Sequence, residues 1–574
     1  MRYLMHSVGA AVLALTVSYS VPTPVAAQSV AGPYLAGRHA AVRSDFDHAS
    51  QYYSRALARD PGNVEMMESA ALAYLSLGNV RQAVPLALAI EKTGSRSQAA
   101  HMLAMTDLID KGDYAGLLAR DVQTQGIGPW VDGLIQAWAQ IGLGDVDAAM
   151  KEFDALSQEA GMMPIVTYHR ALALASVGDF KRADALFASE AAGSAGQTRR
   201  GIMAHAEILS QLGRDEEALK ALEAGFQGNS EPELGRMIAA LKTGATLPWS
   251  HVPSTRAGMA EVFYTFAEIL RGEQAGDHYT LLYARIARHL RADNIDALLL
   301  TAELLESLGQ HELAIAEYKL VPADDPAYHA AELGRAAALR RLDKPEQAIE
   351  VLEQLTRSHG TFAIVHSTLG DTLSGLDRHA EAIASYDKAL ELADDGSQLR
   401  WLLHYRRAVA YERAGKWSEA EADFRAALEI NPEQPQVLNY LGYSLVEKKQ
   451  KLNEALDMIE RAVARSPDSG YIVDSLGWVY YRLGRYDEAV EQMERAVELV
   501  PVDPVVNDHL GDVYWAVGRV REARFQWSRA LSFISKSDTE SEADPERIRA
   551  KLERGLDAVL AEEGAPPLKV ADDN

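Results

Sequence analysis

Two stretches near the C-terminus carry nearly the same residues when they are aligned with an offset of 34 positions. The first, Asp474–Ala489, reads DSLGWVYYRLGRYDEA, and the second, Asn507–Ala523, reads NDHLGDVYWAVGRVREA. Gly477 aligns with Gly511, and a later Gly-Arg pair and alanine also keep their places. A helical unit of this size cannot bury its apolar face alone, so a chain that repeats it must stack the copies to form a core.

The same phase continues through most of the chain. A small residue, usually followed twelve positions later by alanine, recurs at intervals of mostly 33 to 35 residues. Around these marks, apolar side chains return every three or four residues, which predicts amphipathic helices. The small residues are Gly37, Ala71, Ala104, Ala137, Ala171, Ala206, Ala267, Ala302, Ala336, Gly370, Ala408, Gly442, Gly477 and Gly511.

This pattern resembles the tetratricopeptide repeat, a helix–turn–helix unit of the same length. The resemblance implies an all-α, right-handed superhelical solenoid of about fourteen helical hairpins with one central break. We expect Gly477 and Ala489 to lie where the two helices of a hairpin approach closely, because a larger side chain would overpack the contact. Gly484 and Gly518 are expected to adopt the left-handed conformation that ends a helix.

The large-scale interruption of the spacing lies between Ala206 and Ala267. Lys242–Gly258, in its middle, contains proline and glycine and no helical period, which predicts a break in the stack. A polar stretch after Ser535 precedes one predicted terminal helix, Pro545–Glu563. The predicted parts are a signal peptide at 1–27, an N-terminal array at 28–241, an irregular break at 242–257, a C-terminal array at 258–535, and an acidic linker with a terminal helix at 536–574.

The N-terminus has the pattern of a secretory signal peptide. The apolar run Val8–Val21 follows one basic residue, Arg2, and small residues at Val25 and Ala27 precede a cleavage position. The run is short for a membrane span. We therefore expect cleavage after Ala27 and a periplasmic mature protein without a transmembrane span; an uncleaved anchor is the alternative.

Composition excludes several classes of partner. The chain has 574 residues and a formal net charge of −25, whereas nucleic acids and anionic membrane surfaces require clustered Lys and Arg. It contains no cysteine, so neither a disulfide scaffold nor lipid attachment to an N-terminal cysteine is expected. Nucleic acids and anionic membrane surfaces are therefore not expected as partners.

No set of residues has the spacing of a catalytic or metal site. His311–Glu312 lacks the second histidine of a zinc-protease helix, and neither a phosphate-binding loop nor a Gly-x-Ser-x-Gly motif is present. We predict that the chain is not an enzyme and has no catalytic residues, metal or cofactor. A rival hypothesis is a hydrolase around 242–258, where His251 lies; it requires Asp, Glu and His side chains to converge there. A small-ligand carrier would require an enclosed apolar pocket.

The repeat family lines a concave groove with the first helix of each hairpin, and the resemblance implies which positions face inward. Aromatic side chains with flanking carboxylates suit an extended peptide or a partner helix, although tyrosines at such positions also brace adjacent hairpins. Asp474, Trp478, Asp508 and Asp512 replace the Lys and Asn set that family members use to bind a C-terminal carboxylate. The predicted groove residues are Tyr405, Glu412, Arg413, Asn439, Tyr443, Glu447, Asp474, Trp478, Tyr481, Arg482, Asp508, Asp512 and Trp515.

The stretch Val437–Leu531 resembles, more narrowly, exported bacterial repeat proteins that act as adaptors of carboxyl-terminal processing proteases. Related lipoproteins deliver cell-wall hydrolases to such a protease, but this chain lacks their lipidation cysteine. The resemblance implies a non-catalytic periplasmic scaffold that holds partner proteins, such as an envelope protease and its substrates, in the groove. The alternative is a scaffold for envelope assembly or polysaccharide export.

Overall fold

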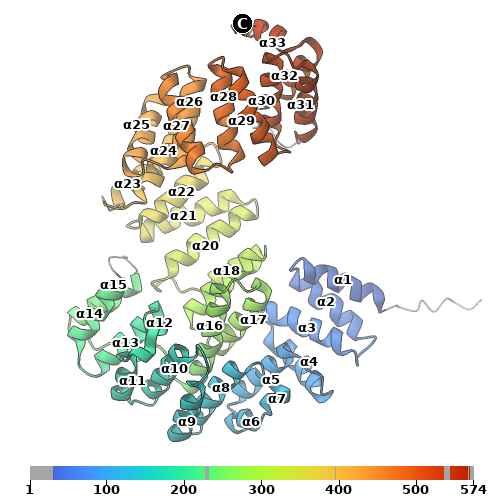
Figure 1. Cartoon of the computed structure of the whole chain (residues 1–574). Helices are drawn as coiled ribbons and strands as arrows, with labels where there is room; N and C mark the ends of the chain where they lie inside the picture. The colour runs from blue at the N-terminus through green and yellow to red at the C-terminus, as the bar shows by residue number, and fades with distance from the viewer. Residues whose placement is uncertain (1–29, 227–231, 395, 535–542, 566–567, 569–574) are drawn as a thin grey trace, which may run out of the picture. The chain divides into compact units, whose positions relative to one another are not determined.

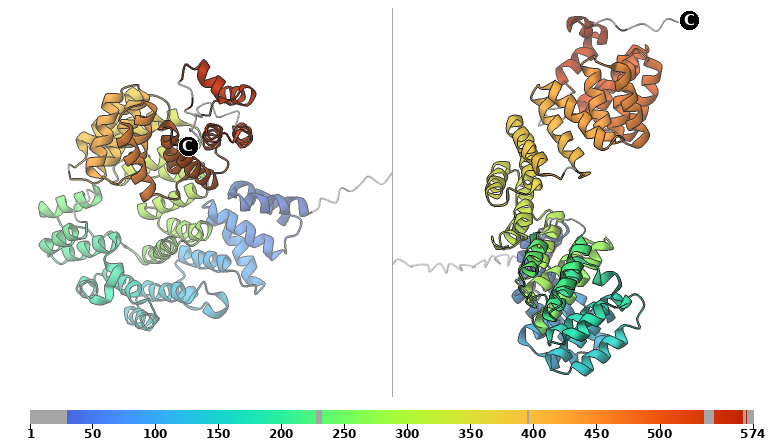
Figure 2. Two further views of the ribbon diagram at one scale, coloured as in Figure 1. Left: turned by 45° about the horizontal axis from the view of Figure 1, so that its top comes forward. Right: turned by 90° about the vertical axis from the view of Figure 1, so that its left-hand side faces the viewer.

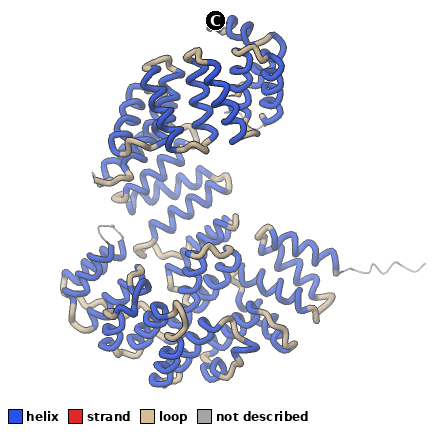
Figure 3. Tube along the Cα trace, viewed as in Figure 1, coloured by secondary structure: helices blue, strands red, loops and turns tan. Residues whose placement is uncertain are grey.

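A computed structural model shows how the chain folds (Figure 1). In the described residues the regular structure is helical, without a strand (Figure 3). The chain divides into two compact units, Met1–Ala331 and Glu332–Asn574, and each is treated by itself. The predicted signal peptide and most of the predicted acidic linker lie outside the described residues. Those residues are 30–226, 232–394, 396–534, 543–565 and 568.

The first unit contains helices that pack against their neighbours in chain order, mostly as hairpins. Helix α20 (Tyr328–Arg341) contains the boundary between the units. The preceding elements are α1 (Ala31–Val42), α2 (Phe46–Leu57), α3 (Val64–Ser76), α4 (Val80–Lys92), α5 (Gln98–Lys111), α6 (Tyr114–Leu118), α7 (Val122–Gln125), α8 (Pro129–Gly142), α9 (Val146–Leu156), α10 (Met163–Ser176), α11 (Phe180–Phe187), the 3₁₀ helix η1 (Glu190–Ala192), α12 (Gly193–Gly196), α13 (Arg199–Gln211), α14 (Asp215–Phe226), α15 (Pro232–Lys242), α16 (Thr255–Gly272), α17 (Asp277–Leu290), α18 (Ile295–Ser307) and α19 (His311–Tyr318).

The second unit continues the same pattern. Within a hairpin the two helices pack together, and the first helices of successive hairpins also touch: α22 with α24, α26 with α28, and α28 with α30. Figure 2 shows the hairpins of each unit from two further directions. The helices are α21 (Pro345–His359), α22 (Ala363–Ser374), α23 (His379–Leu392), α24 (Arg400–Arg413), α25 (Trp417–Ile430), α26 (Pro435–Glu447), α27 (Leu452–Arg465), α28 (Gly470–Arg482), α29 (Tyr486–Leu499), α30 (Pro504–Ala516), α31 (Val520–Phe533), α32 (Pro545–Arg554) and α33 (Leu556–Glu562).

The small residues that mark the repeat lie where the helices of a hairpin meet, as predicted. A Cβ atom added to Gly370 of α22 would lie 2.6 Å from the ring of Tyr386 in α23, and one added to Gly477 would lie 2.7 Å from Met493. Both partner side chains are buried, so neither has open space to move into. The turn at Gly484 has the predicted left-handed conformation, with φ +76°.

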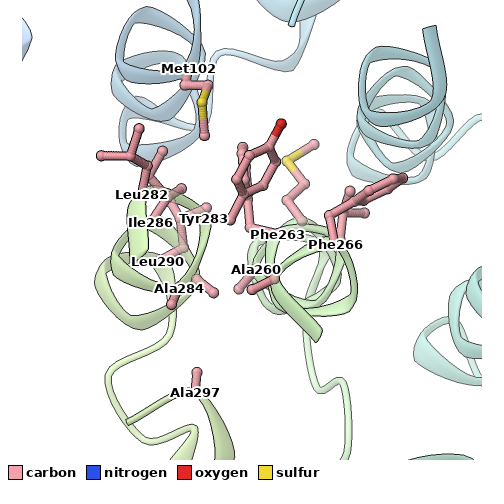
Figure 4. Close-up of a cluster of buried hydrophobic side chains, with 14 of the residues drawn as sticks. Met102, Ala260, Phe263, Phe266, Leu282, Tyr283, Ala284, Ile286, Leu290 and Ala297 are labelled. Atoms are coloured by element: carbon pink, nitrogen blue, oxygen red, sulfur yellow. The ribbon is translucent and has the colours of Figure 1, made fainter. Parts of the chain in front are cut away.

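Helices α16 and α17 pack against the inner face of the first unit. They touch α3, α5, α8 and α10, which are the first helices of earlier hairpins. Figure 4 shows Phe263 of α16 and Tyr283 of α17 beside Met102 of α5. Arg285 of α17 is buried and its Nε donates a hydrogen bond to the carbonyl oxygen of Ser76 at 2.9 Å. The face that would line a groove in the first unit is therefore covered by the chain itself.

The predicted break lies inside the first unit. Residues 243–254 contain no helix, and they connect α15 to α16. The carboxylate of Glu207 holds this segment by accepting hydrogen bonds from the backbone N–H groups of Ser250 and His251 and from the Ser250 hydroxyl. Because α16 then packs back onto α8 and α10, the break does not separate two compact bodies, and the units divide between Ala331 and Glu332 instead.

The predicted single terminal helix, Pro545–Glu563, is two helices. Gly555 separates α32 from α33 and has φ +83°, a conformation that non-glycine residues rarely adopt. A Cβ atom at this position would also lie 2.6 Å from the ring of Trp515. The chain turns at Gly555 so that both short helices lie against the end of the stack.

Candidate protein-binding groove

The first helices of four successive hairpins, α24, α26, α28 and α30, form one face of the second unit. A cavity of about 470 Å³ lies along this face. We call this cavity and its walls the groove. It is lined by Glu412, Arg413, Asn439, Tyr440, Tyr443, Ser444, Glu447, Lys448, Tyr471, Asp474, Ser475, Asp503, Val505, Val506 and His509.

The structure brings six of the predicted groove residues together in these walls: Glu412, Arg413, Asn439, Tyr443, Glu447 and Asp474. Tyr405 lies next to them but packs inward, with its ring centroid 6.1 Å from those of Phe424 and Tyr440. Prediction from the sequence missed Tyr471 and Asp503, which lie at the start of α28 and just before α30. Their exposure at the groove depends on how the turns pack, which the repeat pattern does not encode.

One buried amide oxygen in the groove has no partner. The Oδ1 atom of Asn439 is buried and has no hydrogen bond to any described residue. An unpaired buried acceptor costs about 1–3 kcal/mol. A backbone N–H group from a bound polypeptide would satisfy it.

Trp478 braces three hairpins instead of standing open. Its ring stacks on His509 of α30 with centroids 4.0 Å apart and on Tyr481 with centroids 4.8 Å apart. Its Nε1 donates a hydrogen bond of 2.8 Å to Glu447 of α26, and Arg482 is 3.4 Å from the same carboxylate. Only 9% of the Trp478 surface is exposed. Bracing, which the repeat pattern suggested for tyrosines, is thus the arrangement that the tryptophan adopts.

Asp474 is engaged by a histidine from the next hairpin. The Nδ1 atom of His509 is 3.1 Å from an oxygen of Asp474. Burial acts to lower the pKa of His509, but the carboxylates of Asp474, Asp508 and Asp512 outweigh it, and the pKa is raised above its ordinary value. The imidazolium form of His509 therefore partly neutralises the acidic wall.

The chain's own C-terminal helices engage the last three predicted residues. The Nζ atom of Lys551 in α32 lies 2.8 Å from Asp508 and 2.6 Å from Asp512. The Nε1 atom of Trp515 donates a hydrogen bond of 3.0 Å to Asp557 in α33. These residues are not free for a partner while α32 and α33 are in place. No local pattern could predict this pairing, because about forty residues separate Lys551 from the two aspartates.

The irregular segment of the first unit does bring acidic and histidine side chains together. The Tyr168 hydroxyl donates a 2.8 Å hydrogen bond to Glu261 and lies 3.2 Å from Nε2 of His251. Arg200 forms ion pairs with both Glu261 and Asp296. The convergence that the hydrolase hypothesis required is therefore present.

The chemistry of this cluster is nevertheless that of a structural ion-pair network. Burial, together with the positive charge of Arg200, lowers the pKa of His251 to about 3, so this imidazole is neutral and a weak base. Burial raises the pKa of Glu261, but Arg200 and the other neighbouring groups together outweigh it, and the pKa falls to about 2. Ser250 donates to Glu207 and not to the histidine. Each charged group is thus committed to another protein group.

Two absences among the described residues concern membrane insertion and metal binding. No helix among them is long and apolar enough to cross a membrane. No group of three or more histidine, aspartate or glutamate side chains in the same residues is arranged to hold a metal ion.

Fold and groove together define a protein of stacked helical hairpins. Sequence models of the tetratricopeptide repeat match residues 34–99, 333–397, 401–434 and 445–504, so the hairpins are tetratricopeptide repeats and the predicted family is confirmed. Proteins that carry these repeats serve as scaffolds for protein interactions.

Two bacterial proteins are similar to parts of the chain. The TPR repeat-containing protein PA4667 of Pseudomonas aeruginosa is 26% identical over 174 residues, which are 30% of this chain and 28% of that protein. The lipoprotein NlpI homolog of Haemophilus influenzae is 34% identical over 107 residues, which are 18% of this chain and 33% of that protein. The chain thus spans about a third or less of the length of these relatives.

Among solved structures, the Cut9 complex with Hcn1 aligns with 92% of this chain and 97% of its own, at 15% identity and a TM-score of 0.37.

Proposed function

We propose that the protein is a non-catalytic scaffold that holds a partner polypeptide in the groove of its second unit. The observation that carries this proposal is a contrast between the two units. In the first unit α16 and α17 pack on the inner face and line cavities of about 420 and 590 Å³, whereas in the second unit a cavity of about 470 Å³ is lined by the first helices of the hairpins and the residue before α30. The buried, unpaired oxygen of Asn439 lies in its wall.

The groove has the chemistry to hold a peptide or a helix. Tyr443 and Tyr471 offer aromatic surface, which buries area at a low cost in side-chain entropy. Glu412, Glu447, Asp474 and Asp503 outnumber Arg413 and Lys448 in the walls, although Lys448 pairs with Glu412 and Arg482 with Glu447. The acidic walls favour a partner segment that is neutral or basic.

We further propose that this scaffold acts in the periplasm as an adaptor between an envelope protease, of the carboxyl-terminal processing class, and its substrates, such as cell-wall hydrolases. The support is the signal-peptide pattern at 1–27 and the resemblance of Val437–Leu531 to exported adaptors. The similarity to the Haemophilus lipoprotein homolog points the same way. Two proteins held on one frame meet at a raised effective concentration, and the scaffold needs no catalytic group for that effect.

Capture from the envelope fraction tests the proposal. The full chain carrying Asn439→Ala and Tyr471→Ala should retain less than about a tenth of the partner that the unmodified chain retains, since each lost hot-spot contact costs about 1–2 kcal/mol. Phe525→Ala is the matched control, because Phe525 is exposed on α31 and does not line the groove. Equal capture by the double variant would overturn the assignment of the groove, and capture of no envelope protease would overturn the adaptor role.

A further inference from the structure

Lys551 of α32 lies against α30, at positions whose equivalents in the preceding hairpins face the groove. Lys551 is the one lysine among the described residues that is completely buried. Its Nζ atom lies 2.9 and 2.8 Å from the two oxygens of Asp508 and 2.6 Å from Asp512, and 5.8 Å from the centroid of the Trp527 ring. A buried ammonium group is stable only with such complete pairing.

Asp508 and Asp512 belong to the same surface as the groove. They occupy in α30 the positions that Asp474 and Trp478 occupy in α28, one repeat earlier. Burial raises the pKa of Asp508, and the negative charge of Asp512 raises it further, while Lys551 opposes both. The two carboxylates therefore require a cation from whatever covers α30.

A second cation lies one helical turn before the first. Arg547 is four residues from Lys551, so both side chains project from the same face of α32. Its guanidinium group is 3.7 Å from Asp512 and also pairs with Glu563, just after α33. Each cation is followed by an aliphatic residue, Ile548, which is fully buried, and Leu552, which is partly buried. Helix α32 thus presents two cations and two aliphatic side chains at a spacing of four.

The C-terminal helices cover the end of the stack incompletely. A cavity of about 600 Å³ remains between the α28 side chains Trp478 and Tyr481, Leu560 of α33 and Glu563 just after it. At Gly555, by contrast, the contact with Trp515 leaves no room for a methyl group. The incomplete covering is therefore on the side of α33 that faces α28.

We propose that the surface formed by Asp508 and Asp512 is a binding site for a cationic helix, and that α32 is an internal ligand which a partner's helix of the same chemistry replaces. The partner segment carries Lys or Arg at a spacing of four residues, each followed by an aliphatic side chain. Replacement extends the groove by one hairpin. This inference rests on the proposed function, because it names the chemistry of a partner segment and the contact that keeps the site closed.

A peptide with the sequence of residues 543–564 serves as the probe. Labelled with fluorescein, it should bind the full chain carrying Lys551→Met at least ten-fold more tightly than the unmodified chain, whose own α32 competes at a high effective concentration. The peptide carrying Lys551→Met should bind neither chain, and the peptide carrying Glu553→Gln, altered on the exposed side, should bind as the original does. Equal binding to both chains, or equal binding of all three peptides, would overturn the proposal.

A second measurement uses a chain in which Lys551 is retained. The protein contains no cysteine, so Glu553→Cys accepts a single spin label on the exposed face of α32. Millimolar peptide should convert the label to a mobile spectrum, and the Lys551→Met peptide should not. An immobile label at every peptide concentration would contradict a replaceable helix, whether or not the first variant folds.

The two proposals fail separately. Tyr471→Ala should leave the binding of this peptide unchanged, because Tyr471 lies in the groove and not against α32. The same substitution should lower the capture of the envelope partner. If Tyr471→Ala weakens peptide binding, the site at Asp508 and Asp512 was assigned wrongly. If it leaves partner capture unchanged, the groove was assigned wrongly.

Discussion

The distance between the two helices of a hairpin is limited by single glycines. At Gly370 a methyl group would lie 2.6 Å from the ring of Tyr386, whose hydroxyl is held by a 2.8 Å hydrogen bond to Asp371. Gly370→Ala should therefore lower the free energy of unfolding by about 1–3 kcal/mol, although alanine is the better helix former. Urea unfolding of the full chain measures this change.

Gly375→Ala is the control for that prediction. Gly375 follows the last residue of the same helix, has φ −68°, and a Cβ atom there would lie 3.6 Å from its nearest neighbour, the carbonyl oxygen of Asp371. Its substitution should leave stability unchanged or raise it slightly. A destabilisation equal to that of Gly370→Ala would show that close approach is not the cause.

Two aromatic residues at the groove have opposite roles. Trp478 is stacked between α28 and α30, so Trp478→Ala should lower the free energy of unfolding by about 3–5 kcal/mol. Tyr471 is 59% exposed, so Tyr471→Ala should change stability by less than about 0.5 kcal/mol and act on partner capture instead. Thermal unfolding monitored by circular dichroism separates the two effects; a large loss of stability in the Tyr471 variant would refute this division.

The contact of His509 with Asp474 predicts a pH dependence of stability. The pKa of His509 is raised in the folded chain above the ordinary value of about 6.5. Its stabilising contribution is therefore fully present below about pH 6.5 and is lost as the pH rises through the raised pKa. The difference in unfolding free energy between the unmodified chain and His509→Gln should shrink as the pH rises from about 6.5 through the raised pKa, and a constant difference across that rise would contradict the assignment.

At the scale of elements, an irregular segment depends on one carboxylate. Glu207 accepts three hydrogen bonds from Ser250 and His251, and these hold 243–254 against α13. Glu207→Gln should weaken this anchor by about 1–3 kcal/mol, because a neutral amide is a poorer acceptor for two backbone N–H groups. Hydrogen exchange at Ser250 and His251 should accelerate.

Ser250→Ala is the matched control for the Glu207 variant. It removes the hydroxyl donor and keeps both backbone hydrogen bonds to the carboxylate. Exchange at His251 should therefore change much less than it does in Glu207→Gln. Equal acceleration in both variants would show that the backbone contacts are not the anchor.

The sequence predicted the helices better than it predicted which helices and side chains contact one another. The period of about 34 residues located the hairpins because each hairpin's apolar face and its glycine or alanine contact are local. The period could not show that α16 and α17 cover the inner face of their own unit, since their sequence has the same helical pattern as the others. Nor could it show that Lys551 covers Asp508 and Asp512, because that contact joins distant segments of the chain.

At the scale of the whole molecule, the capacity to hold a partner depends more on an open face than on the number of repeats. Both units are built from helical hairpins, yet in the first unit α16 and α17 pack on the inner face and line its cavities, whereas in the second the groove along α24 to α30 is lined by the hairpins themselves. Six of the groove residues predicted from the sequence line that cavity, while Trp478, Asp508, Asp512 and Trp515 are engaged by the chain itself. We infer that a partner is held by the second unit.

Site-specific photo-crosslinking in living cells tests this claim most directly. A photoreactive phenylalanine in place of Tyr471, in the groove, should capture a partner protein, and the same residue in place of Phe525, which is 62% exposed and outside the groove, should capture none. Capture at Phe525 with none at Tyr471 would contradict the account.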